Sequence, residues 1–190
     1  MEQAKPKAVI MDEQAMKRAV VRIAHEVIEH NEGASDIAVV GIVRRGVTLA
    51  RQLTDAIEEI EGTRPQLGSL DISFYRDDVM RNVAPVIHGT NIPFSVDDEN
   101  IILVDDVLYT GRTVRSALDA LMDLGRPKSV QLAVMVDRGH RELPIRADYV
   151  GKNVPSSHEE DVRVCMKPLD DRNSVEIWEL DAEKNAGGAN

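Results

Sequence analysis

The chain has 190 residues and a normal globular balance of 43% hydrophobic and 29% charged residues, which excludes disorder over most of its length. A chain of this size buries roughly 70% of its unfolded surface, so it needs no disulfide or metal ion to fold. Its net charge of −10 excludes a protein that wraps nucleic acid by bulk charge alone, although a local basic face is compatible with it.

The apolar segments and the N-terminus give no sign of a membrane protein or of secretion. The longest apolar runs, such as residues 101–104, are far too short to span a bilayer. The N-terminal residues lack an apolar signal core. The single cysteine, Cys165, cannot form an internal disulfide and has no partner cysteine for a zinc site. We therefore expect a cytoplasmic protein with no membrane partner.

The first half of the chain alternates predicted strands and helices. Residues 8–11 form a predicted strand, and Asp12 is suited to cap a helix whose apolar residues recur at helical spacing. The apolar run 37–42 is typical of a strand that is covered on both faces, and a helix is expected over 48–60. A third strand is expected over 70–74. Residues 75–98 show no period and are predicted to form a long functional loop or hairpin.

The second half continues this alternation. Strands are expected over 101–104 and 130–136, with a turn over 105–112 and a helix over 113–124 between them. Short strands are expected in three further places: residues 149–150, 162–166 and 175–180. Residues 183–190 have the composition of a frayed tail. The pattern predicts an α/β fold: one domain over residues 1–182 with a mostly parallel central sheet and helices on both faces.

The most informative segment is the strand at 101–104 and the residues that follow it. Asp105 and Asp106 come at the carboxyl end of the strand, where ligands bind in open parallel sheets. A turn with Thr110, Gly111 and Thr113 then opens a helix, so backbone N–H groups and hydroxyls can hold an anion, and the glycine allows close approach. The carboxylates can accept hydrogen bonds from sugar hydroxyls or lie near hydrated magnesium. Together these groups suit a ribose 5-phosphate.

Each part of this segment has a simpler interpretation by itself. Two aspartates can merely solvate a strand end, and a Thr-Gly pair can merely cap a helix. The complete arrangement of strand, paired aspartates and Thr-Gly-x-Thr argues against these purely structural roles. The segment is neither a Walker A loop, since it lacks Gly-Lys-Ser/Thr, nor a Gly-x-Gly-x-x-Gly dinucleotide fingerprint.

Residues 104–113 resemble the phosphoribosyl pyrophosphate (PRPP) signature of type I phosphoribosyltransferases. Residues 71–78, 107–113 and 137–149 closely resemble the family of bifunctional PyrR proteins. These are uracil phosphoribosyltransferases that also regulate pyrimidine operons by binding messenger RNA. The resemblance extends over residues 8–180. It implies the type I phosphoribosyltransferase fold, with a small hood made by about 137–170 plus an N-terminal part, and a flexible loop over about 75–98.

The resemblance implies that the chain converts uracil and PRPP to UMP and pyrophosphate with Mg²⁺. The metal ion would bind with PRPP near Asp105 and Asp106, with no direct protein ligand assigned. Asp105, Asp106 and Arg76 carry the implied catalytic roles, as ribose-hydroxyl ligands and as a loop residue that binds the leaving pyrophosphate. Arg76 can also be a solvated loop residue. The implied PRPP-binding residues are Val104, Asp105, Asp106, Val107, Leu108, Tyr109, Thr110, Gly111, Arg112 and Thr113.

The same resemblance implies sites for pyrophosphate and for the base. Arg44, Arg45 and Gly46 match the pyrophosphate loop, in which family members often hold a non-proline cis peptide. Two arginines and a glycine at a strand end also suit pyrophosphate binding physically, although a solvated turn is the alternative. The implied base-binding residues are Asp137, Arg138 and Val162. His140 has two open interpretations, a general base or a surface histidine.

The regulatory half of the resemblance implies an RNA-binding face made by His25, Arg141, Arg146 and Lys152. The alternative is that these are ordinary solvated charges or dimer contacts. Val21 departs from the family pattern, in which some relatives have a hydroxyl residue there. The implied function is UMP-responsive attenuation of pyrimidine genes through the messenger RNA leader, with UMP or UTP bound. A plain uracil salvage enzyme without RNA binding is the alternative. The family forms homodimers or higher homo-oligomers.

Overall fold

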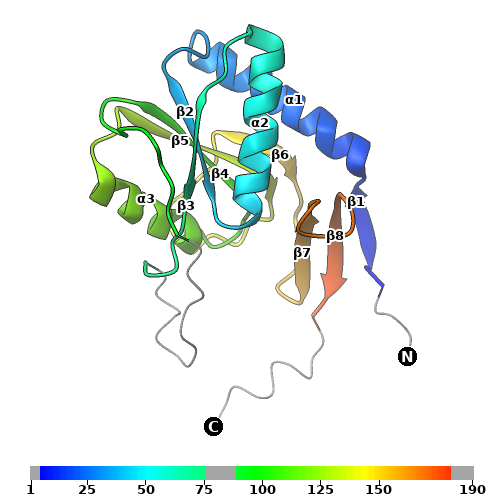
Figure 1. Ribbon diagram of the computed structural model, residues 1–190. Coiled ribbons are helices and arrows are strands. Elements are labelled where there is room, and N and C mark those ends of the chain that lie inside the picture. The colour runs from blue at the N-terminus through cyan, green and yellow to red at the C-terminus, as the bar shows by residue number, and fades with distance from the viewer. Residues whose placement is uncertain (1–4, 76–88, 181–190) are drawn as a thin grey trace.

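A computed structural model describes residues 5–75 and 89–180 of the chain, and these build two separate sheets (Figure 1). The strands of the larger sheet are all parallel and follow the order β3-β2-β4-β5-β6. The smaller sheet is antiparallel, with the order β1-β8-β7. The bounds are β1 Ala8–Met11, β2 Ile37–Ile42, β3 Gln66–Leu70, β4 Asn100–Leu108, β5 Ser129–Asp137, β6 Tyr149–Asn153, β7 Glu160–Cys165 and β8 Ser174–Glu179.

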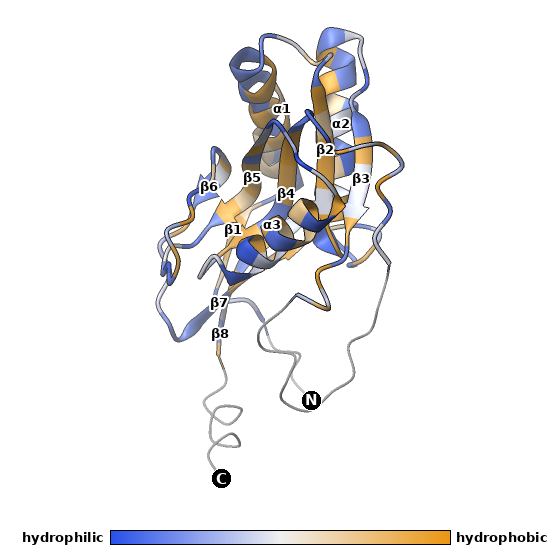
Figure 2. Cartoon of the chain, turned by 90° about the vertical axis from the view of Figure 1, so that its left-hand side faces the viewer, coloured by the Kyte–Doolittle hydropathy of each residue, from blue (hydrophilic) through white to orange (hydrophobic). Residues whose placement is uncertain are grey.

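Helices cover both faces of the parallel sheet. Helices α1 (Glu13–His30) and α2 (Arg45–Glu61) pack on one face, and α3 (Arg112–Leu124) packs on the other (Figure 1). All six residues of β2 are buried, as expected for a strand between two helical layers. Along β4 the side chains alternate between the two cores. Figure 2 shows that the central strands β2, β4 and β5 are largely apolar. The predicted α/β architecture is confirmed.

The starts of α1 and α2 each depend on one residue, a capping aspartate in α1 and a glycine in α2. Asp12 caps α1 as predicted, because its carboxylate accepts a hydrogen bond of 2.7 Å from the Ala15 N–H. Helix α2 begins at Arg45, three residues before the predicted start. A Cβ atom on Gly46 would lie 2.5 Å from the Val104 carbonyl oxygen, so only glycine lets the first turn of α2 approach β4 this closely.

Two strands differ from the predicted ranges. The strand predicted over 70–74 is wrong: β3 spans Gln66–Leu70, and the chain then turns because the Asp71 carboxylate accepts a hydrogen bond from the Ser73 N–H at 2.9 Å. Strand β4 extends beyond the predicted 101–104 to Leu108, because Asp105 still pairs with Val134 of β5. The paired aspartates therefore belong to the strand end and not to a turn.

Parts of the sequence-based predictions lie outside the described residues. The central part of the predicted loop, with Arg76, and the predicted tail over 183–190 belong to this group. Within the described ranges, no helix combines the length and the hydropathy that crossing a membrane requires.

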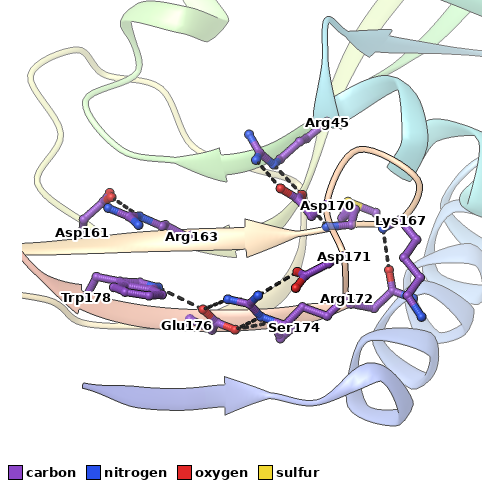
Figure 3. A network of polar contacts seen from close by, with 12 residues as sticks. Arg45, Asp161, Arg163, Lys167, Asp170, Asp171, Arg172, Ser174, Glu176 and Trp178 are labelled. Carbon is purple, nitrogen blue, oxygen red and sulfur yellow. Dashed lines mark hydrogen bonds and ion pairs between the residues drawn. The ribbon is translucent and has the colours of Figure 1, made fainter. Parts of the chain in front are cut away.

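The antiparallel sheet contains a buried carboxylate that is fully hydrogen-bonded (Figure 3). Glu176, on β8, is 2% exposed and accepts hydrogen bonds from Arg172, Ser174 and the indole N–H of Trp178. The Arg172 guanidinium in the first place, with the two neutral donors, lowers the pKa of Glu176 to about 2 in spite of its burial. This network fixes the strand β8 beside the loop that joins it to β7.

Candidate functional site

The carboxyl ends of β2 and β4 lie side by side, and the two helices that follow them start at the same place. A cavity of about 400 Å³ opens there. It unites residues that the sequence predicted for two different subsites. Its lining consists of Ile42, Val43, Arg44, Arg45, Asp71, Ile72, Ser73, Asp105, Asp106, Val107 and Thr113. The cavity thus combines three carboxylates, two guanidinium groups and the starts of two helices.

The two adjacent carboxylates of this cavity, Asp105 and Asp106, differ in burial. Asp105 is 6% exposed, whereas Asp106 is half-buried. The Asp106 N–H donates a hydrogen bond of 2.9 Å to Asp105 Oδ1. Loss of hydration raises the pKa of Asp105 well above its ordinary value, and the neighbouring negative charge of Asp106 raises it further. A cation or a row of hydroxyl donors bound in this cavity would relieve that cost.

The turn after β4 leads directly into α3. Gly111 has a φ of +93°, and a Cβ atom there would lie 3.3 Å from the Ile145 Cβ atom, so the turn needs glycine for its conformation and its packing. Gly111 is the N-cap residue of α3 and makes no side-chain capping bond, while the Thr110 hydroxyl accepts a hydrogen bond of 3.4 Å from the Arg112 N–H. The Thr110 carbonyl accepts hydrogen bonds from the N–H groups of Glu142 and Leu143, at 2.9 and 3.2 Å. The segment that follows β5 therefore supports the turn from behind.

The start of α2 forms the opposite wall of the cavity. The Val43–Arg44 peptide bond is cis, as the family resemblance implied, and the Val43 N–H donates to the Leu70 carbonyl at 3.0 Å. Arg44 precedes the helix, and no described side chain caps its first turn. Arg45 forms an ion pair with Asp170, whose carboxylate holds the pKa of the arginine above its ordinary value. Two helix starts thus face the paired aspartates.

The residues predicted to face the base lie around two further cavities. Val162, on β7, lines a cavity of about 620 Å³ together with Arg45 and Asp106, which also line the first cavity. Asp137 and Arg138, at the end of β5, line a third cavity of about 610 Å³ with His140. The structure therefore does not gather Asp137, Arg138 and Val162 around one cavity.

The Arg138 side chain is committed to internal contacts. Its guanidinium lies 4.2 Å from the centre of the Tyr109 ring and donates to the carbonyls of Ser157 and Glu160 at 3.1 and 2.6 Å. It is 6% exposed, so it acts as a buried anchor between the turn after β4 and the segment before β7. His140 is likewise engaged: a ring nitrogen contacts the Ser156 carbonyl oxygen.

The predicted RNA-binding residues fall into two groups. His25 on α1, Lys152 on β6 and Arg146 are exposed, and α1 packs beside β6. Arg141 instead donates to the carbonyls of Tyr109 and Ile145, at 2.7 and 2.8 Å, and pairs with Asp137. It therefore holds the segment after β5 in place.

Two exposed arginines extend this basic surface along α1. Arg18 and Arg22 precede His25 by seven and three residues, so the three lie on one side of the helix. Arg22 donates to the Val150 and Gly151 carbonyls at 3.0 and 2.7 Å and so ties α1 to β6. The sequence-based prediction did not include these two arginines; the spacing of four and three residues between Arg18, Arg22 and His25 is the signal that could have found them.

The architecture and the site together define a phosphoribosyltransferase. The family model of the phosphoribosyl transferase domain matches residues 8–167. Among solved structures, a hypoxanthine phosphoribosyltransferase from Trypanosoma cruzi covers 100% of both chains with a TM-score of 0.73 and 15% sequence identity. One from Staphylococcus aureus covers 97% of this chain and 99% of its own with a TM-score of 0.70 and 19% identity. At such identities the likeness shows the fold alone.

Sequence relatives narrow the assignment. A bifunctional protein PyrR from Clostridioides difficile is 56% identical over 174 residues, which are 91% of this chain and 98% of the relative. The PyrR protein of Bacillus subtilis is 55% identical over 176 residues, 91% of this chain and 97% of its own. That of Alkaliphilus metalliredigens is 60% identical over 167 residues, 87% and 92% of the two chains. The chain belongs to the PyrR family of phosphoribosyltransferases.

The burial of the Asp105 carboxylate leads to a prediction about the pH dependence of stability. Because folding raises the pKa of Asp105, the native state loses stability as the pH rises above the unfolded value of 3.8, where the carboxyl would otherwise ionise. Asp105→Asn keeps the Oδ1 acceptor and removes the charge. We expect it to stabilise the fold by about 1 kcal/mol at pH 8, or roughly 2–4 °C in Tm, with little gain at pH 4.

Thermal unfolding at the two pH values measures this effect. Asp106→Asn is the matched control, since its half-buried side chain should give a smaller gain. A destabilised Asp105→Asn variant at pH 8, or an equal gain at both pH values, would contradict the account of Asp105.

Proposed function

We propose that this member of the PyrR family transfers ribose 5-phosphate from PRPP to N1 of uracil, and that its UMP-bound form binds the leader of pyrimidine messenger RNA to control attenuation. The observation that carries the proposal is the cavity between β2 and β4, in which paired aspartates meet two helix starts, in a chain 55–60% identical to PyrR proteins. A regulator that only bound UMP would need the phosphate and ribose contacts of this site, but not the two arginines on its pyrophosphate side.

The turn after β4 is the proposed cradle for the 5′-phosphate of PRPP. Backbone N–H groups at the start of α3 and the hydroxyls of Thr110 and Thr113 bind the phosphate, and Gly111 lets the backbone approach it. Asp105 and Asp106 accept hydrogen bonds from the ribose hydroxyls. Their negative charge also stabilises the sugar cation that develops as the bond to pyrophosphate breaks.

The start of α2 is the proposed binding site for pyrophosphate. Arg44 and Arg45 supply guanidinium donors, and Gly46 keeps the helix start close to Asp105. We expect Arg76 to add a contact to the leaving group, a role that rests on the sequence, because this residue lies outside the described ranges. The arginines at the start of α2 and the aspartates at the end of β4 match the charge separation of the transition state, in which the pyrophosphate is negative and the sugar positive.

The residues of the cavity fit a magnesium ion that arrives with PRPP. Asp105 and Asp106 supply the hard oxygen ligands or hydrogen-bond acceptors that Mg²⁺ and its bound waters prefer. Within the described ranges, no group of three or more histidine, cysteine, aspartate or glutamate side chains is arranged so that it could hold a metal ion. When bound, the ion neutralises the charge of the pyrophosphate.

For uracil we propose the cavity beside β7. It shares Arg45 and Asp106 with the PRPP cavity, so a base there lies next to the ribose. Main-chain groups near Val162 are the proposed readers of the base edge. Asp137 and Arg138 line a different cavity, so we propose that Arg138 acts indirectly, through its hydrogen bonds to the Ser157 and Glu160 carbonyls beside β7. Because a ring nitrogen of His140 is bound to the Ser156 carbonyl, we expect the N1 proton to leave through water.

The exposed basic side chains along α1 and β6 are the proposed contact surface for RNA. His25, Arg146 and Lys152 would bind phosphates directly, and Arg141 would act through the segment that it holds. Unpaired loop bases would give specificity, because A-form grooves are poorly readable. We further propose that the protein acts in the cytoplasm as a homodimer or higher homo-oligomer, in which this surface is repeated.

Substrate choice tests the enzymatic half. We expect UMP formation from uracil, PRPP and Mg²⁺, with hypoxanthine, adenine and orotate inactive. Replacing Asp105 and Asp106 together with asparagine should lower turnover by about 10³-fold or more and leave the fold intact, because the ribose contacts and the charge are both lost. Product formation followed by chromatography gives both results. Conversion of another base in place of uracil, or unchanged turnover in the double variant, would refute this half.

RNA binding tests the regulatory half against the alternative of a plain salvage enzyme. Filter binding with leader RNA from the organism's own pyrimidine genes should be tight, stimulated by UMP and steeply weakened by salt. Lys152→Ala should weaken binding and lower the salt slope by about 1.

The control for that experiment is Lys128→Ala, an exposed lysine just before the start of β5, which should leave binding unchanged. Binding no tighter than to an unrelated RNA, with or without UMP, would support the plain salvage enzyme.

A further inference from the structure

Asp170 connects the antiparallel sheet to the PRPP cavity (Figure 3). It lies in the loop between β7 and β8, and its carboxylate binds Arg45 at the start of α2. We propose that Asp170 is a positioning residue: it holds the Arg45 guanidinium at the boundary between the PRPP cavity and the cavity beside β7, ready to receive the pyrophosphate. This inference rests on the proposed function.

The contact between the two side chains is bidentate. Arg45 Nε donates to Asp170 Oδ2 at 3.1 Å, and Nη2 donates to Oδ1 at 2.8 Å. This geometry fixes the plane of the guanidinium as well as its position. Asp170 is itself fixed, because Oδ2 accepts the Met166 N–H at 2.7 Å and the Asp170 N–H donates to the Met166 carbonyl at 2.9 Å. The acceptor is therefore rigid before any ligand arrives.

The arginine keeps one edge available. Its side chain is 41% exposed, against 18% for Asp170, and it lines both cavities. Nε and Nη2 are used by Asp170, and within residues 5–75 and 89–180 Nη1 has no hydrogen-bond acceptor. An oxyanion in the PRPP cavity can thus bind Arg45 without breaking the ion pair. A guanidinium held in advance loses less conformational freedom when the ligand binds.

Asp170 has a second effect on pyrophosphate affinity, and this effect is opposite in direction to that of positioning. Its negative charge partly neutralises Arg45, and this by itself weakens attraction for pyrophosphate. Removal of the charge alone would therefore tighten pyrophosphate binding. Loss of positioning would weaken it. The direction of the change in affinity distinguishes the two effects.

The antiparallel sheet offers a matched control. Asp161 and Arg163 form an ion pair of 2.7 Å on β7, and both line the cavity beside β7 together with Asp170. Neither residue is bound to α2. Asp161→Asn therefore removes the same charge from the same cavity without touching Arg45.

The test measures binding of Mg²⁺-pyrophosphate and of PRPP by calorimetry, with steady-state kinetics alongside. We expect Asp170→Asn to weaken Mg²⁺-pyrophosphate by about 5- to 20-fold, to raise KM for PRPP by a similar factor, and to leave KM for uracil nearly unchanged. Asp161→Asn should bind both ligands as the wild type does. In an Arg45→Ala background, Asp170→Asn should have no further effect on pyrophosphate.

Some results would overturn the positioning role of Asp170, and a different result would refute the proposed function. Unchanged or tighter pyrophosphate binding by Asp170→Asn, or the same loss in Asp161→Asn, would overturn the positioning role. A further loss in the Arg45→Ala background would also overturn it, since the variant would then act by disturbing the loop between β7 and β8. A wild-type protein that binds neither PRPP nor Mg²⁺-pyrophosphate would refute the proposed function itself.

Discussion

The close approach of α2 to the end of β4 is the constraint on which the rest of the site depends. Gly46 allows it, because any Cβ atom at that position would collide with the Val104 carbonyl oxygen. The approach brings Arg44 and Arg45 to the same cavity as Asp105. Positive helix starts and negative strand ends then face each other across a space that fits a charged sugar phosphate. Any side chain in place of Gly46 would push the start of α2 away from the end of β4 and so separate the arginines from the aspartates.

Two buried carboxylates, Glu176 and Asp105, have opposite pKa shifts, and the first has a structural role while the second belongs to the candidate site. Glu176 is bound by Arg172, Ser174 and Trp178, so its pKa falls to about 2 and its charge stabilises the antiparallel sheet. Asp105 is also buried, and loss of hydration, together with the neighbouring charge of Asp106, raises its pKa. Such an unfavourable charge persists where a ligand compensates it, which is typical of functional sites. Burial raises the pKa of both carboxyl groups. The donors around Glu176 outweigh that effect, whereas the carboxylate of Asp106 adds to it at Asp105.

Local patterns in the sequence predicted the parallel sheet, the helices on both faces and the paired aspartates at a strand end, because these depend on short-range periodicity and on the geometry of parallel sheets. The start of α2 was missed, because a close approach between elements leaves no periodic signal. The turn at Asp71 depends on one side-chain hydrogen bond. The internal roles of Arg138 and Arg141, and the contact of Asp170 with Arg45, join residues distant in sequence and required the structure.

The central claim is that two helix starts and the end of β4 form one PRPP site. Hydrogen–deuterium exchange with and without PRPP and Mg²⁺ tests it most directly, because it reports on backbone N–H groups at each segment separately. The account predicts that amides of residues 44–48 and 107–115 become protected together at the same PRPP concentration. Protection confined to one of these segments, or found only in the segment after β5, would contradict it.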